Sequence, residues 1–438
     1  MRTFAIMRQS VTYHIANVEL FKSELTAWAT QFERSAVLLG NTDASQGLYL
    51  KSELLVGVEA LSEISPVSNS FEELKSYQEQ KQDWLFGFLS YDLKNELEDL
   101  QSNHLDELQF PNMHFFQPKW VFEIQGNQVT IHFPEEVERQ EMQQLFGEIM
   151  QFQPNYWESV VPAVQARISK ETYLKQVATL QEHIQRGDIY EVNFCQEFYV
   201  EDAVLHPLAT FEKLNAISEP PFAAYYRLGK KHLMCASPER FVKKKGQKLI
   251  SQPIKGTRKR GSSIAEDELL KKELAACPKE RSENVMIVDL VRNDLSKTAA
   301  KASVQVEELF GIYSFRQVHQ MISTITSELK EGVGGVEAIQ HAFPMGSMTG
   351  APKIRAMKLI EEYEQTKRGL YSGSVGYFTP NGDFDFNVVI RSILYNAAKQ
   401  YAAFMVGGAI TAKANAEQEY EECMVKAKAM FEVLGHDC

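Results

Sequence analysis

Acidic side chains at helical spacing are the first groups in this sequence that could do chemistry. Glu419, Glu422 and Lys426 are separated by three and then four positions, which places them on one face of a helix. Glu280 and Glu283 repeat the three-residue spacing at the start of an apolar segment. A solvated charged stripe is the ordinary interpretation of either set alone. Two carboxylate-bearing helices together could hold a hard cation such as Mg²⁺.

Lys255 is a candidate nucleophile. It stands in the segment SQPIKGTRKRG, with Pro253 before it and Gly256 directly after it. The proline stiffens the approach, and the glycine permits close contact between the backbone and a ligand. A lysine held in such a site can have its pKa lowered enough to attack a substrate. An exposed basic loop is the alternative interpretation.

Glycine-rich turns provide candidate positions for binding an anion. Residues 344–353, PMGSMTGAPK, form a turn that enters a helix, where backbone amides can meet an anion. The spacing is not that of a P-loop, which argues against nucleoside triphosphates. Gly407 and Gly408 offer a second pair of amides after a strand. With three further side chains they would form a site for a small dicarboxylate: Tyr371, Arg391 and Lys426.

The charge balance limits the partners that the chain could bind. Its 438 residues include 46 Lys and Arg against 58 Asp and Glu, a net charge of −12. This charge opposes general attraction to nucleic acid or to an anionic membrane, so any anion must be captured locally. No segment approaches the roughly 18 apolar residues of a membrane span. We therefore expect a cytosolic protein that binds neither nucleic acid nor membrane.

The cysteines indicate neither a disulfide framework nor a zinc site. The five cysteines are odd in number, widely scattered and without a C-x-x-C pair. The sequence also lacks a Gly-x-Cys-x-Gly segment of the kind that presents the nucleophile of a glutamine-hydrolysing enzyme. An ammonia-using reaction would therefore depend on a separate source of ammonia.

Hydrophobic periodicity and turn signals predict the elements that position these residues. Ser169 should start a helix that stops near Gly187, and Ser263 with Glu266 forms a capping box. Asn381-Gly382 predicts a hairpin turn. Further helices are expected over 284–294, 352–364 and 417–434, and strands over 232–236, 241–244 and 249–254, with a last strand ending at 407–408.

Taken in order, the motifs resemble those of the chorismate-utilising enzyme family. The matching segments include GDIYEVNFCQ, ASPERF, SQPIKGTRKRG, SENVMIVDLVRNDL, PMGSMTGAPKIRAM and YSGSVGYF, and they extend over roughly residues 165–435. The resemblance is specific, because many independent motifs occur in one order. It implies an α+β (α/β complex) fold in which two antiparallel sheets pack together and helices cover the outside. Residues 1–155 and 160–436 both contribute to that core, the second as the catalytic region.

The P-I-K-G-T form is similar to the aminodeoxychorismate synthase component I branch of the family, which serves folate synthesis. That similarity implies that Lys255 adds to C2 of chorismate while Glu239, in ASPERF, protonates the departing C4 hydroxyl. Ammonia then attacks C4 and expels the lysine, which gives 4-amino-4-deoxychorismate. Gln196 is placed where water-using relatives carry a basic lysine, and this argues against isochorismate formation.

The family also implies ligands for Mg²⁺ and for the substrate. Glu283 and Glu422 match the principal metal ligands, with Glu280 and Glu419 beside them. The enolpyruvyl carboxylate would be held by Tyr371, Arg391, Gly407 and Gly408, and the rest of the pocket would be lined by Gly256, Thr257, His319, Thr349 and Lys426.

Two alternative functions and one partner protein follow from the same resemblance. The alternatives are an anthranilate synthase component I, which would release pyruvate, and a catalytically silent relative that binds tryptophan. Residues 85–93, LFGFLSYDL, resemble the segment near which relatives hold tryptophan. The expected partner is a separate glutamine amidotransferase that forms a heterodimer with this chain and supplies its ammonia.

Overall fold

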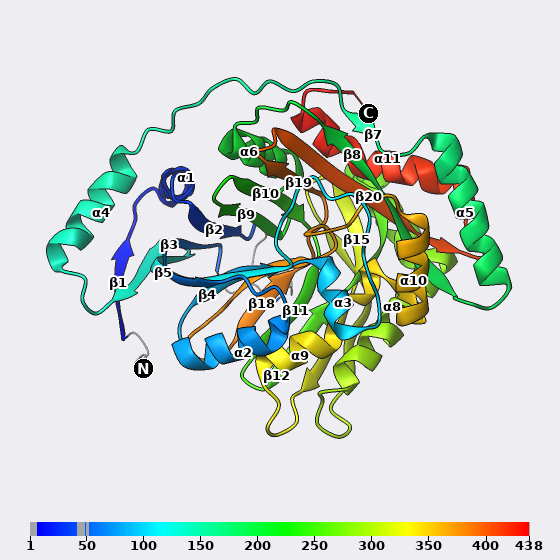
Figure 1. The fold of residues 1–438 in the computed structure, drawn as a ribbon, viewed down its shortest axis with the longest axis horizontal. Coiled ribbons are helices and arrows are strands. Elements are labelled where there is room, and N and C mark those ends of the chain that lie inside the picture. The colour runs from blue at the N-terminus through cyan, green and yellow to red at the C-terminus, as the bar shows by residue number, and fades with distance from the viewer. Residues whose placement is uncertain (1–6, 42–48, 50–51, 438) are drawn as a thin grey trace.

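The strands of this protein are joined into one antiparallel network. The computed structural model describes residues 7–41, 49 and 52–437. Within them, hydrogen bonding connects 20 strands, and helices cover the outside of the network (Figure 1). The expected mixed α and β fold with antiparallel sheets and outer helices is confirmed. The two expected sheets are hydrogen-bonded to each other in the described part of the chain.

The strand bounds are β1 Arg8–His14, β2 Arg34–Leu39, β3 Leu54–Ile64, β4 Leu85–Leu89, β5 Met113–Gln125, β6 Gln128–Pro134, β7 Gln165–Ala166, β8 Glu191–Val200, β9 Phe222–Leu228, β10 Lys231–Ser237, β11 Arg240–Lys245, β12 Lys248–Gln252, β13 Ile254–Lys259, β14 Gln305–Ser314, β15 Val318–Glu328, β16 Gly350–Ala351, β17 Ser374–Phe378, β18 Phe384–Asn387, β19 Ser392–Asn396 and β20 Tyr401–Thr411.

The α-helices are α1 Val18–Ala29, α2 Ser70–Lys81, α3 Lys94–Leu97, α4 Arg139–Gln151, α5 Lys170–Gln185, α6 Pro207–Ser218, α7 Ile264–Ala276, α8 Pro278–Ser296, α9 Gly335–Ala342, α10 Lys353–Tyr363 and α11 Ala416–Val433. Two short 3₁₀ helices are η2 Tyr91–Leu93 and η3 Gly346–Met348.

Local signals explain where several helices begin. The side chain of Ser169 accepts a hydrogen bond from the amide of Thr172 at 3.2 Å and caps α5. The side chain of Ser263 accepts one from the amide of Glu266 at 3.3 Å and caps α7. Each cap satisfies an amide that has no partner inside the helix. The expected helix start at Ser169 and the capping box at Ser263 are confirmed.

The last strand differs from its prediction. It was expected to end at Gly407 and Gly408, but β20 continues through both glycines to Thr411. From Ala402 to Thr411 it pairs with β8, and Gly407 lies opposite Cys195. Long antiparallel pairing supplies backbone partners that outweigh the weak strand preference of glycine.

Three strands, β12, β13 and β14, pair with the same strand, β15. β12 and β13 pair successively with β15, and β14 pairs with its other edge. Helix α8 packs against β13 and β15, and α11 packs against β20. Helix α8 thus lies on the β13–β15 pair, and helix α11 lies on β20, which pairs with β8.

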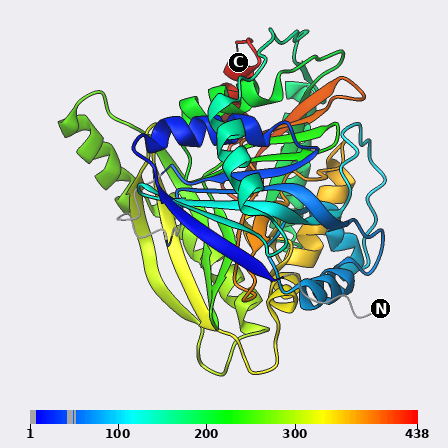
Figure 2. The same cartoon turned by 90° about the vertical axis from the view of Figure 1, so that its left-hand side faces the viewer.

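The amino-terminal and carboxy-terminal regions share the network. β2 pairs with β9, and β4 pairs with β17. Strands from residues 1–155 therefore continue the sheet built by residues 160–436. Figure 2 shows these strands crossing the molecule beneath the amino-terminal helix α1.

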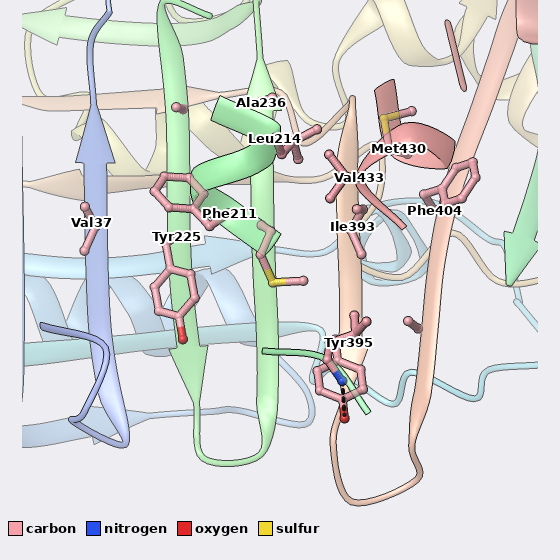
Figure 3. Close-up of a cluster of buried hydrophobic side chains, with 14 of the residues drawn as sticks. Val37, Phe211, Leu214, Tyr225, Ala236, Ile393, Tyr395, Phe404, Met430 and Val433 are labelled. Atoms are coloured by element: carbon pink, nitrogen blue, oxygen red, sulfur yellow. Dashed lines mark hydrogen bonds between the residues drawn. The ribbon is translucent and has the colours of Figure 1, made fainter. Parts of the chain in front are cut away.

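A large hydrophobic cluster fixes the helices on this sheet. Figure 3 shows side chains of α6 and α11, among them Phe211 and Met430, facing Tyr225, Ile393 and Phe404 on the strands. These residues are at most 2% exposed. Burying each of these side chains stabilises the fold by roughly 1.5–3 kcal/mol. The position of α11, which carries three candidate site residues, thus depends on its apolar face.

None of the helices in the described part of the chain is both long and apolar enough to cross a membrane.

Candidate active site

One cavity gathers most of the residues expected at the site. It has a volume of about 340 Å³ and lies where β8, β13 and β20 meet α8 and α11. The expected residues that line it are Glu239, Lys255, Gly256, Thr257, Glu280, Glu283, Tyr371, Arg391, Gly407, Gly408, Glu419, Glu422 and Lys426. They come from segments that are far apart in the sequence.

A break in strand register surrounds Lys255. β13 pairs with β15 at Ile254 and Ile322 and again at Thr257 and Gln320, but the register shifts between these pairs. Such an irregularity takes a residue out of the regular ladder and can redirect its side chain. Lys255 lies inside the shifted segment and lines the cavity.

Gly256 makes this backbone path possible. Its φ angle is +97°, a conformation that side chains other than glycine rarely adopt. A Cβ atom at this position would also lie 3.1 Å from Oε2 of Glu280. The glycine after Lys255 is therefore required by the backbone conformation and by the neighbouring helix.

Lys255 forms an ion pair inside the cavity. Its Nζ lies 2.8 Å from Oε1 of Glu191, and the two side chains are 12% and 8% exposed. Burial acts to lower the pKa of Lys255, but Glu191 and Glu283 outweigh it and raise the pKa above its usual value. The sequence prediction of a lowered pKa is wrong for this arrangement, because burial is accompanied by opposite charge.

Glu239 is a buried carboxyl group on the same cavity. It lies between β10 and β11 and is 5% exposed. Burial raises the pKa of Glu239 to about 7, although the positive charge of Lys255 acts against this rise. A carboxyl group with such a pKa can hold a proton near neutral pH and donate it.

The acidic helices reach the cavity from two sides. Glu280 and Glu283 lie on α8, and Glu419 and Glu422 lie on α11. Burial raises the pKa of Glu283 to about 7, while Lys255 and Lys279 act to lower it. Burial also raises the pKa of Glu419, and the nearby charge of Glu422 adds to that rise. These carboxylates therefore repel each other and attract cations.

Basic side chains contact all four of these carboxylates. Nη1 of Arg258 lies 3.3 Å from Oε1 of Glu280, and Nζ of Lys426 lies 2.8 Å from Oε1 of Glu422. The remaining two carboxylates, those of Glu283 and Glu419, are both contacted by Lys279, at 3.9 Å and 3.4 Å.

Carboxylate oxygens are the donors that Mg²⁺ prefers, so the chemistry of this set fits the expected ion. Their present positions are not those of a closed metal site. Within residues 7–41, 49 and 52–437, no three His, Cys, Asp or Glu side chains converge closely enough to hold a metal ion. The metal assignment of Glu280, Glu283, Glu419 and Glu422 stays a prediction, and it requires these side chains to move.

Gly407 and Gly408 lie where the strands approach the acidic helix. The carbonyl oxygen of Gly407 accepts a hydrogen bond from Nζ of Lys426 at 2.8 Å. A Cβ at Gly407 would lie 2.4 Å from Sγ of Cys195, and one at Gly408 would lie 3.2 Å from Oε2 of Glu419. Because successive backbone groups of a strand point to opposite edges, both amides cannot face one ligand.

Tyr371 and Arg391 line the wall next to these glycines. Burial raises the pKa of Tyr371 well above its usual value, so the phenol stays neutral and can donate a hydrogen bond. Nη1 of Arg391 donates to the carbonyl oxygen of Lys426 at 3.2 Å, which ties the strand end to α11. Both side chains are in a position to meet an anionic ligand in the cavity.

Three expected site residues lie outside the lining of this cavity. Gln196 is 3% exposed, and its amide atoms have no hydrogen-bond partner within the described residues. His319 is fully buried between Ser314 and Asp267, at 2.8 Å and 3.0 Å. Thr349 is also buried, and its hydroxyl donates to backbone carbonyl groups. Their expected contact with a ligand is not supported by this arrangement.

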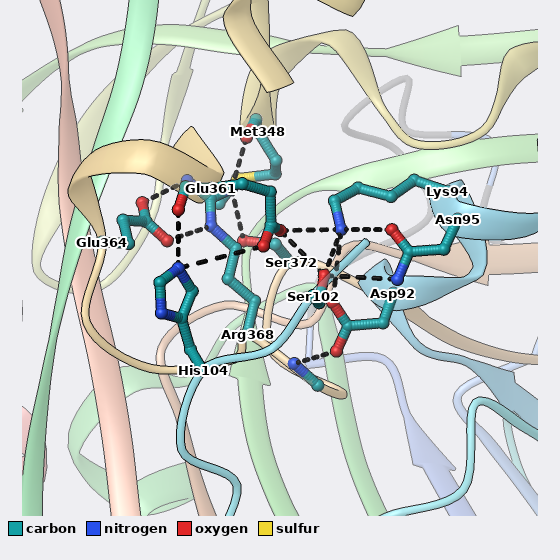
Figure 4. A network of polar contacts seen from close by, with 11 residues as sticks. Asp92, Lys94, Asn95, Ser102, His104, Met348, Glu361, Glu364, Arg368 and Ser372 are labelled. Atoms are coloured by element: carbon teal, nitrogen blue, oxygen red, sulfur yellow. Dashed lines mark hydrogen bonds and ion pairs between the residues drawn. The ribbon is translucent and has the colours of Figure 1, made fainter. Parts of the chain in front are cut away.

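A buried ion pair supports the part of the cavity wall that contains Met348. Arg368 and Glu364 lie 2.6 Å apart with side chains at most 3% exposed. Figure 4 shows Arg368 next to Glu364 and the backbone of Met348, which lines the cavity. Arg368 also donates to the carbonyl oxygen of Asn193 at 2.8 Å, and Glu364 accepts from the amide of Cys195 at 2.8 Å.

A second buried cation lies in the same polar network (Figure 4). Nζ of Lys94 contacts Glu361 at 2.8 Å, Asp92 at 3.4 Å and the hydroxyl of Ser102 at 2.7 Å. Its side chain is fully buried. These contacts tie the segment after β4 to α10, so the amino-terminal region braces the wall of the cavity.

The glycine-rich turn before α10 is held in place by Lys353. Nζ of Lys353 lies 2.6 Å from Oδ2 of Asp294 and also donates to the carbonyl oxygens of Ala342 and Pro344. The ammonium group of Lys353 is therefore engaged by Asp294 and the turn, and it does not line the cavity.

Residues 85–93 form the segment near which tryptophan binding was expected. They make β4 and η2, and most of their side chains are buried in the core. A second cavity of about 70 Å³ lies nearby, lined partly by Leu38, Tyr377 and Asp385, with no lining residue from 85–93. Tryptophan binding stays a prediction.

Glu191 and Lys279 are the site residues that sequence reasoning missed. Glu191 lies within the motif GDIYEVNFCQ, where a charged residue in a buried strand was the available signal. Lys279 stands four residues before Glu283, so helical spacing already placed the two together.

The chain is similar in sequence to several known proteins. The chain is 35% identical over 365 residues to aminodeoxychorismate synthase component 1 of Bacillus subtilis, covering 80% of this chain and 76% of that protein. It is 34% identical over 357 residues to anthranilate synthase component 1 of Thermus thermophilus, covering 80% and 76%. It is also 41% identical over 273 residues to an aminodeoxychorismate synthase of Streptomyces griseus, and there it spans 62% of this chain but only 37% of the relative.

Solved structures show the same fold. Anthranilate synthase component I from Streptococcus pneumoniae TIGR4 superposes with a TM-score of 0.71 at 28% identity, covering 79% of this chain and 80% of that one. The menaquinone-specific isochorismate synthase of Escherichia coli gives a TM-score of 0.75 at 16% identity, covering 98% and 95%. The family model described as chorismate binding enzyme matches residues 32–432. This chain therefore belongs to the chorismate binding enzyme family.

Proposed function

We propose that this protein aminates chorismate at C4 to give 4-amino-4-deoxychorismate, as an aminodeoxychorismate synthase component 1. The observation that carries the proposal is the position of Lys255 inside the large cavity, together with the protonatable Glu239. A lysine amine can add to an electrophilic ring carbon, and a carboxyl group with a pKa of about 7 can protonate a departing hydroxyl.

Proton positions decide the order of events. Lys255 is an ammonium group beside Glu191, so it must first transfer a proton, and Glu191 is the acceptor within hydrogen-bonding distance. The free amine then forms a bond to C2, the two ring double bonds shift, and the C4–O bond breaks. Glu239 supplies the proton that converts the leaving hydroxyl to water.

The second half of the reaction reverses the first bond shift. Ammonia forms a bond to C4, the double bonds return, and the C2–N bond to Lys255 breaks. Lys255 leaves as an amine and recovers its proton from Glu191, and the ammonium group formed at C4 gives one proton back to Glu239. The enolpyruvyl group stays on the ring throughout.

The remaining residues would hold and orient the substrate. Tyr371 and Arg391 would bind the enolpyruvyl carboxylate, together with the backbone at Gly407. Glu283 and Glu422 would be the principal holders of Mg²⁺, with Glu280 and Glu419 beside them. When bound, the ion would offset the negative charge of the ring carboxylate.

Ammonia would come from a separate glutamine amidotransferase. The naming of relatives as component 1 and the absence of a glutaminase-type cysteine motif in this sequence support that proposal. Free ammonium salt should replace the partner at alkaline pH, where more of it is present as ammonia.

Anthranilate formation is the second candidate, because a component 1 of that activity matches over an equal share of this chain. One assay separates the two. Purified protein is incubated with chorismate, MgCl₂ and ammonium chloride, and the products are resolved by mass and fluorescence. We expect 4-amino-4-deoxychorismate without pyruvate. Anthranilate with pyruvate would overturn the proposal, and so would no turnover even with an added amidotransferase.

A Lys255→Ala variant tests the covalent step. We expect loss of C4 amination and of any adduct between protein and substrate detected by intact mass. Lys245→Ala is the matched control, because this exposed lysine lies on β11 and does not line the cavity. Retained C4 amination in Lys255→Ala would exclude the lysine adduct as an obligatory intermediate.

A further inference from the structure

Lys279 bridges the two acidic helices of the cavity. Its Nζ lies 3.9 Å from Oε1 of Glu283, on its own helix α8, and 3.4 Å from Oε1 of Glu419 on α11. One ammonium group thus lies between carboxylates of two different helices. Both carboxylate side chains are much more buried than the lysine side chain.

The helix alone does not explain this position. Lys279 lies in the first turn of α8, where the partial positive charge of the helix end disfavours a cation. A lysine placed four residues before a glutamate is also the less favourable order for a helical ion pair. The carboxylates around it therefore account for its position, because both helical effects act against it.

The side chain of Lys279 is charged and free to leave. The side chain is 54% exposed, whereas those of Glu283 and Glu419 are 13% and 4% exposed. The ammonium group can therefore swing into solvent while the carboxylates stay in the cavity.

The neighbouring basic side chains, Arg258 and Lys426, do not lie between the two acidic helices in this way. Arg258 contacts Glu280, and Lys426 contacts Glu422, so each reaches a carboxylate of one helix. Lys279 is the cation that contacts carboxylates of both helices in the described part of the chain. A divalent ion that joined Glu283 to α11 would compete with this ammonium group for the same carboxylates.

We propose that Lys279 is an internal counter-ion that competes with the divalent cation of this enzyme. In the free protein its ammonium group neutralises Glu283 and Glu419 and keeps the affinity for Mg²⁺ low. The ion binds when Lys279 moves to solvent, and an anionic substrate in the same cavity favours this exchange by adding negative charge. The inference rests on the proposed function, since that function supplies the metal.

Titration calorimetry with MgCl₂ in the absence of chorismate tests the competition. Lys279→Met removes the charge at similar length, and we expect it to bind Mg²⁺ about tenfold more tightly or better than the unmodified protein. Lys279→Arg keeps the charge and should bind as weakly as the unmodified protein. Lys271→Met is the matched surface control, because Lys271 pairs with Glu268 on α7 and does not line the cavity. It should leave the affinity unchanged.

A second measurement locates the bound ion. Electron paramagnetic resonance with Mn²⁺ counts tight sites, and adding Glu283→Gln to Lys279→Met should remove the site gained. Lys279→Gln serves if Lys279→Met does not fold.

The outcomes separate this inference from the proposed function. If the unmodified protein binds Mg²⁺ in the presence of chorismate but Lys279→Met gains no affinity, only the counter-ion role is overturned. If no variant binds Mg²⁺ with or without chorismate, the metal assignment fails together with the inference. Tight binding that survives Glu283→Gln would place the ion elsewhere and also overturn it.

Discussion

Nζ of Lys255 and Oε1 of Glu191 lie 2.8 Å apart, so the proposed nucleophile is half of a nearly buried ion pair. The two residues are 64 positions apart in the sequence and meet because β8 and β13 border one cavity. The pair holds the amine in place but also keeps it protonated. The reaction therefore needs a way to remove that proton, and Glu191 is adjacent to it.

The first prediction concerns Glu191→Gln. The amide keeps a hydrogen-bond acceptor but removes the charge that holds the pKa of Lys255 above its usual value. We expect Lys255 to react with acetic anhydride about tenfold faster at a fixed pH near neutrality, since one pKa unit changes the free amine fraction about tenfold. Mass spectrometry of the peptide that contains Lys255 measures this rate without any turnover.

The control for this variant is Glu197→Gln. Glu197 lies on the same strand and is also buried, but it pairs with Arg167 at 2.9 Å. Its substitution should leave the labelling of Lys255 unchanged. Equal labelling rates in Glu191→Gln and the unmodified protein would show that Glu191 does not control the charge of Lys255.

The second prediction separates activity from stability at Glu239. Its folded-state pKa is raised from 4.5 to about 7. The unfolded chain therefore loses the proton first as the pH rises, and this group destabilises the fold progressively between about pH 4.5 and 7. Glu239→Gln removes that penalty. We expect the variant to gain on the order of 3 kcal/mol at pH 8 relative to pH 5, compared with the unmodified protein.

Urea unfolding at the two pH values measures this difference, and the same variant should lose C4 amination. A pH-independent difference in stability would mean that the pKa of Glu239 is the same in the folded and the unfolded chain. Retained amination would assign the proton donor to another group.

Short-range signals made much of the fold predictable. The caps at Ser169 and Ser263 each depend on a contact three residues away. The turn at Asn381-Gly382 places glycine at φ +76° between β17 and β18. Such features follow from residue type and local backbone chemistry, so they can be inferred without knowing the rest of the structure.

The geometry of the site was less predictable, because it depends on contacts across the fold. Motif order placed Lys255 and Glu239 in one site, but the ion pair to Glu191 depends on how two strands meet. His319 was expected to line the substrate pocket, yet its Nε2 is hydrogen-bonded to Oδ1 of Asp267 on α7 at 3.0 Å. Gly407 and Gly408 were expected at a strand end, and the length of the partner strand extends β20 beyond them.

The third prediction concerns the buried pair of Arg368 and Glu364. Arg368→Met leaves the buried carboxylate of Glu364 without its cation and frees the carbonyl oxygens of Met348 and Asn193. We expect the free energy of unfolding to fall by about 3 to 5 kcal/mol. Urea unfolding followed by fluorescence provides the measurement.

The double variant Arg368→Met with Glu364→Gln is the test of mechanism. It removes the unpaired charge, so its cost should be clearly smaller than the sum of the two single substitutions. Additive costs would show that the two side chains stabilise the fold independently, and the wall of the cavity would not depend on their pairing.

The fourth prediction uses two glycines that share a backbone conformation but differ in their surroundings. Gly256 and Gly246 have φ angles of +97° and +62°. A Cβ at Gly256 would lie 3.1 Å from Oε2 of Glu280 and 3.2 Å from Leu274, whereas one at Gly246 would have no neighbour within 4 Å. Substitution by alanine thus imposes backbone strain of roughly 1 kcal/mol or more at both positions, but steric contact at Gly256 alone.

We expect Gly256→Ala to displace Lys255 and lower kcat by about 100-fold, the effect of shifting a reacting group by about 1 Å. Gly246→Ala should lose some stability and keep kcat, because this turn lies away from the cavity. Steady-state amination with ammonium chloride and thermal unfolding of both variants give the comparison. Equal kcat values in the two variants would mean that the backbone at Gly256 does not control the position of the amine, and the register shift in β13 would then have no catalytic consequence.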